Sequence, residues 1–112
     1  MQFPDDQIEE MKSLWPEARK YEESGILYFF LPQLRLPDGC SPSQVDALLC
    51  PTNHSGYTSR LFFEQVITSP QPRNWTTTAR IMERNWHAIS WQYPETNLRL
   101  AQMVGVHLRA FR

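Results

Sequence analysis

The residues best suited to chemistry gather in one stretch, residues 84–91, which reads Arg-Asn-Trp-His-Ala-Ile-Ser-Trp. It places an imidazole, His87, three residues before a hydroxyl, Ser90. A serine hydroxyl becomes an effective nucleophile only when a positioned base takes its proton. Residues three apart on a strand point to opposite faces, so these two groups meet only if the backbone here is irregular. His87 therefore has two alternative roles: it is either a catalytic residue or a histidine that packs inside the fold or at an interface.

The same stretch carries two large aromatic residues, Trp86 and Trp91, and begins with Arg84. Rings of this size commonly fill a hydrophobic core. Trp and Arg are also the residue types that anchor protein–protein interfaces. The residues alone leave both roles open.

The chain has two cysteines, and the sequence predicts different roles for them. Cys40 follows a Pro-Asp-Gly turn at residues 37–39, where an accessible thiol becomes nucleophilic if a neighbour lowers its pKa. Arg35 is the cation nearest to it in the sequence, and packing of the turn is the alternative role for this thiol. Cys50 ends an apolar stretch just before a proline, which favours a structural role.

The histidines and cysteines do not have the spacing of a metal site, and no glycine-rich phosphate loop or paired-carboxylate motif is present. We therefore expect neither a metal nor a cofactor. His54 lies in a polar loop, where contact with a partner is one alternative. His107 is expected at the surface or edge of the last helix.

Length and composition favour a small globular domain covering residues 1–112, because 41% of the residues are hydrophobic and 12% are aromatic. No apolar run is long enough to cross a bilayer, so no membrane contact is expected. With a pI of 6.3 the composition does not favour general nucleic-acid binding. Residues 1–15 carry four acids and do not match a secretory signal, so we expect a cytoplasmic protein with reduced thiols.

Hydrophobic periodicity predicts the elements that position these residues. A helix begins near Pro4, and a second follows residues 94–97 with one apolar stripe. Strands are expected at residues 26–31, 45–50, 57–67 and 85–92, while residues 17–23 form a polar turn and residues 75–83 are ambiguous. Short connections between these strands predict an α+β fold, in which an N-terminal helix, a four-stranded antiparallel meander and a C-terminal helix make two layers.

Several short segments together resemble the prokaryotic ubiquitin-conjugating-enzyme-like proteins of family E. These are small bacterial proteins found beside genes for ubiquitin-like modifiers, activating enzymes and deubiquitinase-like peptidases. The resemblance covers about residues 24–112 and implies a ubiquitin-conjugating-enzyme-like two-layer sandwich. It rests on Leu31-Pro32, Leu36-Pro37-Asp38-Gly39-Cys40, Asp46-Ala47-Leu48-Leu49-Cys50-Pro51, Gly56-Tyr57-Thr58-Ser59-Arg60-Leu61-Phe62-Phe63, Asn85-Trp86-His87-Ala88-Ile89-Ser90-Trp91 and His107-Leu108-Arg109-Ala110.

The resemblance implies a carrier of a ubiquitin-like protein, with that modifier and its activating enzyme as partners. Ubiquitin-conjugating enzymes hold the modifier on a cysteine that follows the fourth strand and precedes a Trp-x-Pro segment, and an asparagine before it supports the oxyanion. Residues 91–94, Trp-Gln-Tyr-Pro, are similar to that segment. This sequence departs from the pattern, because no cysteine follows residue 50.

Three interpretations follow from this departure. Ser90 replaces the thiol and carries an oxyester, with Asn85 or His87 assisting; or Cys40 takes the role; or the chain is a catalytically inert scaffold. The scaffold would bind the modifier or its activating enzyme through Tyr57, Arg60, Arg84, Trp86 and Trp91. A further alternative is a small nucleic-acid-binding module that uses the C-terminal arginines and loses affinity steeply with salt. The sequence does not indicate an oligomeric state.

Overall fold

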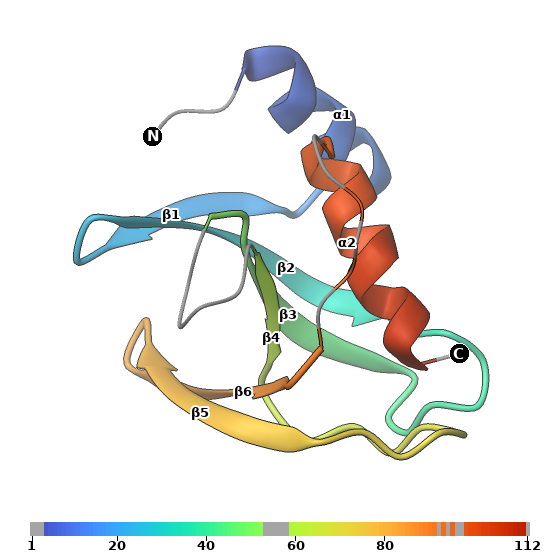
Figure 1. Cartoon of the computed structure of the whole chain (residues 1–112). Helices are drawn as coiled ribbons and strands as arrows, with labels where there is room; N and C mark the ends of the chain where they lie inside the picture. Colours follow the sequence, from blue (N-terminus) through green and yellow to red (C-terminus); the bar gives the residue numbers. More distant parts are fainter. Residues whose placement is uncertain (1–3, 53–58, 92, 94, 96–97, 112) are drawn as a thin grey trace.

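The computed structural model describes residues 4–52, 59–91, 93, 95 and 98–111. Within these residues the chain forms two short α-helices, six strands and a closing 3-10 turn (Figure 1). In chain order they are α1 (Asp5–Leu14), β1 (Arg19–Glu23), β2 (Ile26–Arg35), β3 (Gln44–Cys50), β4 (Arg60–Phe63), β5 (Trp75–Ile81), β6 (Arg84–Ile89), α2 (Leu100–Leu108) and η1 (Arg109–Phe111).

All six strands belong to one antiparallel sheet in the order β1-β2-β3-β4-β6-β5. The first four strands are neighbours in chain order. The last hairpin joins the sheet through β6, which pairs with β4 at Phe63 and His87. Strand β5 therefore forms one edge of the sheet. The other edge is β1.

Strand β2 shows why both faces of this sheet are buried. Its apolar run is continuous, and continuous runs are typical of strands covered on both sides. Phe29 and Leu31 lie in a core beneath the helices, whereas Tyr28 and Phe30 lie in a second core on the opposite face. Strand β2 is therefore covered on both of its faces.

The second core is closed by the two hairpins of the sheet. Figure 1 shows the β1–β2 and β5–β6 hairpins reaching out on the same side of the molecule, away from α2. The backbone N–H of Met82, in the β5–β6 turn, donates to Oε1 of Glu23 at 3.1 Å, which joins the two hairpin ends. Trp86 is 0% exposed here and meets Phe30 edge-on, with ring centroids 6.2 Å apart.

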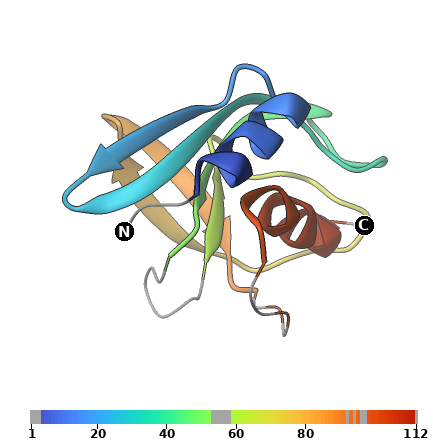
Figure 2. The same ribbon diagram turned by 90° about the horizontal axis from the view of Figure 1, so that it is seen from above.

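The helices lie side by side over the other face of the sheet (Figure 2). Arg99, at the start of α2, donates to Asp6 and Glu10 of α1 at 2.9 Å each. Gln7 also accepts from the first N–H of α2, at Leu100. These contacts join the two ends of the chain, and both helices begin where the sequence predicts.

The predicted fold class is wrong. The described part of the chain has a mostly β architecture, a six-stranded antiparallel sheet with two short helices, and not a four-stranded meander in a ubiquitin-conjugating-enzyme-like α+β sandwich. Residues 19–23, expected in a polar turn, form edge strand β1, and the ambiguous residues 75–83 supply edge strand β5. The third predicted strand, 57–67, is reduced to Arg60–Phe63 in the described part.

Within the described residues, no helix combines the length and apolar character needed to cross a membrane.

Candidate functional site

A buried cluster of polar side chains lies where β4, the segment after β6 and α2 meet. Ser59 directly precedes β4, Tyr93 follows β6, and His107 occupies the last turn of α2. The Oγ of Ser59 lies 2.9 Å from Nε2 of His107 and is also hydrogen-bonded to the hydroxyl of Tyr93. Ser59 is 2% exposed and His107 is 7% exposed. A hydroxyl and an imidazole thus meet in an enclosed position.

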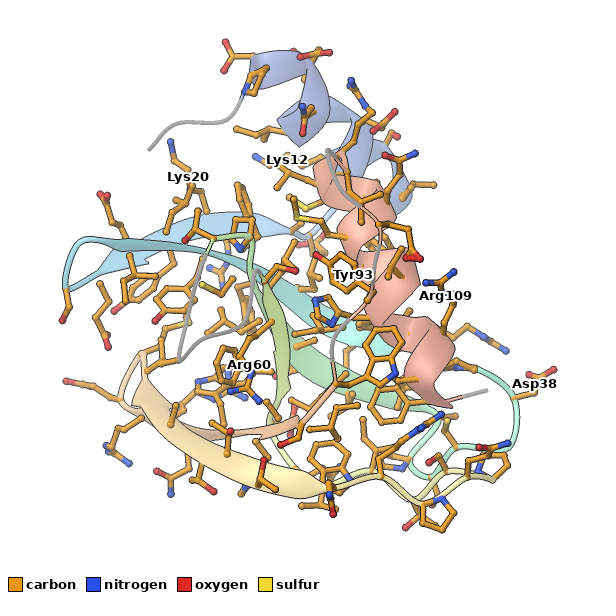
Figure 3. The ribbon with its side chains drawn as sticks, in the orientation of Figure 1. Lys12, Lys20, Asp38, Arg60, Tyr93 and Arg109 are labelled. Carbon is orange, nitrogen blue, oxygen red and sulfur yellow. The ribbon has the colours of Figure 1, made fainter. Side chains whose placement is uncertain are left out.

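Aromatic rings surround the imidazole. Tyr93 stands perpendicular to His107 with a centroid distance of 5.2 Å, and Trp91 lies 6.0 Å away. Trp91 and Tyr93 are half-buried and lie 6.1 Å from each other. Figure 3 places Tyr93 beside α2, with Arg109 on the outer side of that helix. The cluster therefore has an apolar, partly exposed aromatic rim.

The imidazole of His107 is held neutral. Burial, together with the smaller effect of the positive charge of Arg60, lowers its pKa from 6.5 to about 4. A neutral imidazole can accept a hydrogen bond from a hydroxyl at Nε2 when its own proton is on Nδ1. The arrangement is chemically able to polarise the Ser59 hydroxyl.

Arg60, a predicted partner-binding residue, is buried beside this cluster. Its Nη2 donates to the backbone carbonyl of Ile89 at 2.8 Å, and its guanidinium lies 5.7 Å from the centroid of Phe62. The hydrogen bond joins the start of β4 to the end of β6. The side chain therefore supports the site from inside and does not face a partner directly.

Two of the predicted catalytic residues, Asn85 and His87, lie on β6, whereas Ser90 lies beyond its end. Asn85 is exposed and accepts from Nη1 of Arg80 at 3.2 Å. His87, half-buried, pairs with Thr78 of β5 and Phe63 of β4. Because β6 is regular from Arg84 to Ile89, alternation keeps His87 and Asn85 on one face of the hairpin.

Ser90 lies beyond the end of β6 and is exposed. Its hydroxyl is hydrogen-bonded to that of Thr76, and its N–H donates to the carbonyl of Asn74 at 2.9 Å. The structure therefore brings Ser90 together with the start of β5. The catalytic roles of Ser90, His87 and Asn85 stay predictions.

Both thiols are held in the protonated form. Cys40 is half-buried and contacts the carbonyl of Phe111 at 3.6 Å, and burial raises its pKa. Cys50 is fully buried and contacts the carbonyl of Thr52 at 3.5 Å. Burial raises the pKa of Cys50 despite the hydrogen bonds to Thr52 and the charge of Arg60. Neither environment generates a thiolate near neutral pH.

Arg84 covers the second core at the surface. Its guanidinium lies 4.7 Å from the Trp86 ring centroid and 5.7 Å from that of Phe30. The same Nη2 pairs with Asp46 at 3.2 Å and with Glu64 at 3.8 Å. Trp86 is thus enclosed by the core and by Arg84, and only the arginine, 38% exposed, is open to a partner. Tyr57 lies outside the described residues.

The sequence interpretation missed the cluster itself. It placed His107 at a surface or edge, which is wrong, because this residue continues the buried stripe formed by Leu100 and Val104. That spacing was a usable signal for a buried position. Nothing in the sequence indicated contact with Ser59, 48 residues away. The described residues contain no group of three or more His, Cys, Asp or Glu side chains able to hold a metal ion.

Comparisons with protein-family profiles, with curated proteins and with solved structures gave no match for this chain.

Proposed function

We propose that this protein is a non-catalytic binding component of a ubiquitin-like conjugation pathway, which docks the modifier or its activating enzyme without carrying the modifier covalently. The pathway is suggested by the resemblance of the sequence segments to family E. The single observation that carries the non-catalytic role is the state of the thiols. Cys50 is fully buried and Cys40 is half-buried, and this burial raises the pKa of each thiol, so the chemistry of a thioester carrier is disfavoured at both.

The partly exposed aromatic rim of the site supports a docking role. Trp91 and Tyr93 present rings at the surface while the buried Ser59 and His107 fix the position of Tyr93 from below. Arg109, the first residue of η1 directly after α2, donates to both carboxylate oxygens of Glu95, at 2.7 and 2.6 Å. Tryptophan, tyrosine and arginine are the residue types that most often dominate binding energy at protein interfaces.

The docking role is tested by titrating the chain, in a calorimeter, with a bacterial ubiquitin-like protein and with its activating enzyme, the two partners that the resemblance implies. We expect saturable binding to one of them, weakened about tenfold or more by Trp91→Ala. Trp15→Ala is the matched control, because Trp15 is also a half-buried tryptophan but follows α1 at a different position in the fold. Absence of binding to both proteins, or equal weakening by both variants, contradicts the proposal.

A second candidate function is favoured by the 2.9 Å contact between Ser59 and His107. In this alternative Ser59 accepts the modifier as an oxyester. The Oγ attacks the thioester carbonyl held by the activating enzyme, its proton passes to Nε2 of His107, and the carbon–sulfur bond breaks. His107 then returns the proton to the departing thiolate. The burial of Ser59 opposes this function, because an acyl donor has to reach the Oγ.

The two candidates give different products. The oxyester alternative predicts an adduct that resists thiols, is cleaved by hydroxylamine and is lost in Ser59→Ala. Ser90→Ala is the matched control, because Ser90 is the exposed serine hydroxyl that the sequence suggested as nucleophile. An adduct lost in Ser90→Ala and kept in Ser59→Ala excludes the Ser59 alternative.

A further inference from the structure

The two edges of the sheet are protected to different degrees. An edge strand presents unpaired backbone groups, and charged side chains are a common means of keeping other chains away from it. Four of the five residues of β1 are charged, namely Arg19, Lys20, Glu22 and Glu23. Its end is also tied to the opposite hairpin through Glu23. Strand β1 is therefore a poor template for another strand.

Strand β5 has the opposite character. It holds three consecutive threonines, which favour β structure, and a single charged residue, Arg80. It forms the lower margin of the molecule in Figure 1. A bulge between Trp75 and Thr77 leaves Thr77–Ile81 as a regular segment opposite β6. This five-residue segment is long enough for a short antiparallel ladder.

We propose that the β5 edge pairs with β5 of a second copy of this chain, in antiparallel register about a two-fold axis at Ala79. Ala79 then faces its counterpart, Thr78 faces Arg80 of the second copy, and Thr77 faces Ile81 of the second copy. This inference goes beyond the proposed function and does not depend on it. It rests on the residue pattern of β5 and its place at the sheet edge.

The register follows from charge and from the position of the bulge. Thr78 and Arg80 are both exposed, while Thr77, Ala79 and Ile81 face the more buried side. Every two-fold register centred on a residue pairs residues of the same face, so charge and the bulge decide which residue lies on the axis. An axis at Arg80 would place two guanidinium groups opposite each other, which is unfavourable. An axis at Thr78 would extend the pairing into the bulge. The axis at Ala79 avoids both problems and keeps the pairing within the regular segment.

A second copy of this chain fits the β5 edge because two β5 segments can pair in this register without placing like charges opposite each other. The buried area of five paired residues is small, so the association is expected to be weak, as for small interfaces in general. The weight-average mass should rise above the 13.2 kDa of one chain between micromolar and millimolar concentration in sedimentation equilibrium. This measurement uses the protein alone, so it is independent of any pathway partner.

Charge substitutions at Thr78 test the register. Thr78→Lys places an ammonium group opposite Arg80 of the second copy, twice per dimer, and should weaken dimerisation about fivefold. Thr78→Glu places a carboxylate at the same position and should strengthen it about fivefold. Gln65→Lys and Gln65→Glu are the matched controls, because Gln65 is exposed outside the strands and the charge changes are identical.

Circular dichroism of each variant establishes that it is folded before its mass is measured. A wild-type chain that stays monomeric at millimolar concentration overturns the proposal and leaves the edge to an extended segment of another protein. Shifts in the same direction for both Thr78 variants, or shifts equal to those of the Gln65 controls, also overturn it.

Discussion

Lowering the pH from 7 to 4 should destabilise the protein through His107. Its imidazole is 7% exposed, and burial with the charge of Arg60 lowers its pKa from 6.5 to about 4. Between these two values the unfolded chain binds a proton that the folded chain does not bind. Stability therefore rises with pH across this window and is lost as the pH falls through it.

The size of this loss of stability follows from the pKa values of His107 in the unfolded and folded chain. Each pH unit over which only the unfolded chain is protonated costs about 1.4 kcal/mol. From 6.5 to about 4 this amounts to about 3 kcal/mol, a large share of the stability of a small domain. Asp6 and Glu95 also have lowered pKa values, from ordinary values of 3.8 and 4.5, so their contributions are lost mainly at more acidic pH.

The assay is urea unfolding, monitored by tryptophan fluorescence and repeated at steps of half a pH unit between pH 7 and pH 4. His107→Gln removes the titrating group and keeps an uncharged hydrogen-bonding side chain next to Ser59. The free energy of unfolding of the wild type should fall by about 3 kcal/mol more than that of the variant over this range. An equal fall in both proteins would refute the assignment of the acid sensitivity to His107.

Three further predictions concern the second core, the arginine that covers it and the two thiols. Trp86→Ala should cost about 3–5 kcal/mol in urea unfolding, because the ring is fully buried against Phe30, and a loss below 1 kcal/mol would be inconsistent with that packing. Arg84→Met should cost about 1 kcal/mol, less in molar salt, because the ion pairs to Asp46 and Glu64 are partly exposed; a loss independent of salt would argue against them. Cys40 and Cys50 should react with iodoacetamide more slowly than free cysteine at mildly alkaline pH and at the free rate in urea; fast labelling of the folded chain would contradict the raised pKa values.

The sequence predicts best where periodicity and burial agree. The apolar run from Ile26 predicts β2, and the helical spacing before Trp15 predicts α1. Strand β1 is missed because its charged residues read as a solvated turn, although they suit an edge strand. The β5–β6 hairpin is missed because Met82 and Glu83 form its turn at φ values of +56° and +60°, without the Gly or Asn that normally marks such a turn.

The candidate site was harder to predict than the strands. Ser59, Tyr93 and His107 come together only because the sheet and α2 converge, and contacts of such long sequence separation leave no local pattern. Arg60 shows a related limit, since a charged residue in a sequence is expected at the surface. Its burial depends on the carbonyl of Ile89 at the end of another strand.

The most direct test of the non-catalytic binding role is an intact-mass measurement. The chain is incubated with the activating enzyme, the ubiquitin-like protein and ATP, under conditions in which the activating enzyme itself becomes charged. We predict that the chain keeps its unmodified mass while co-eluting with one of the two proteins in size-exclusion chromatography. A covalent adduct of the chain with the modifier, whether cleaved by thiols or by hydroxylamine, would contradict the account.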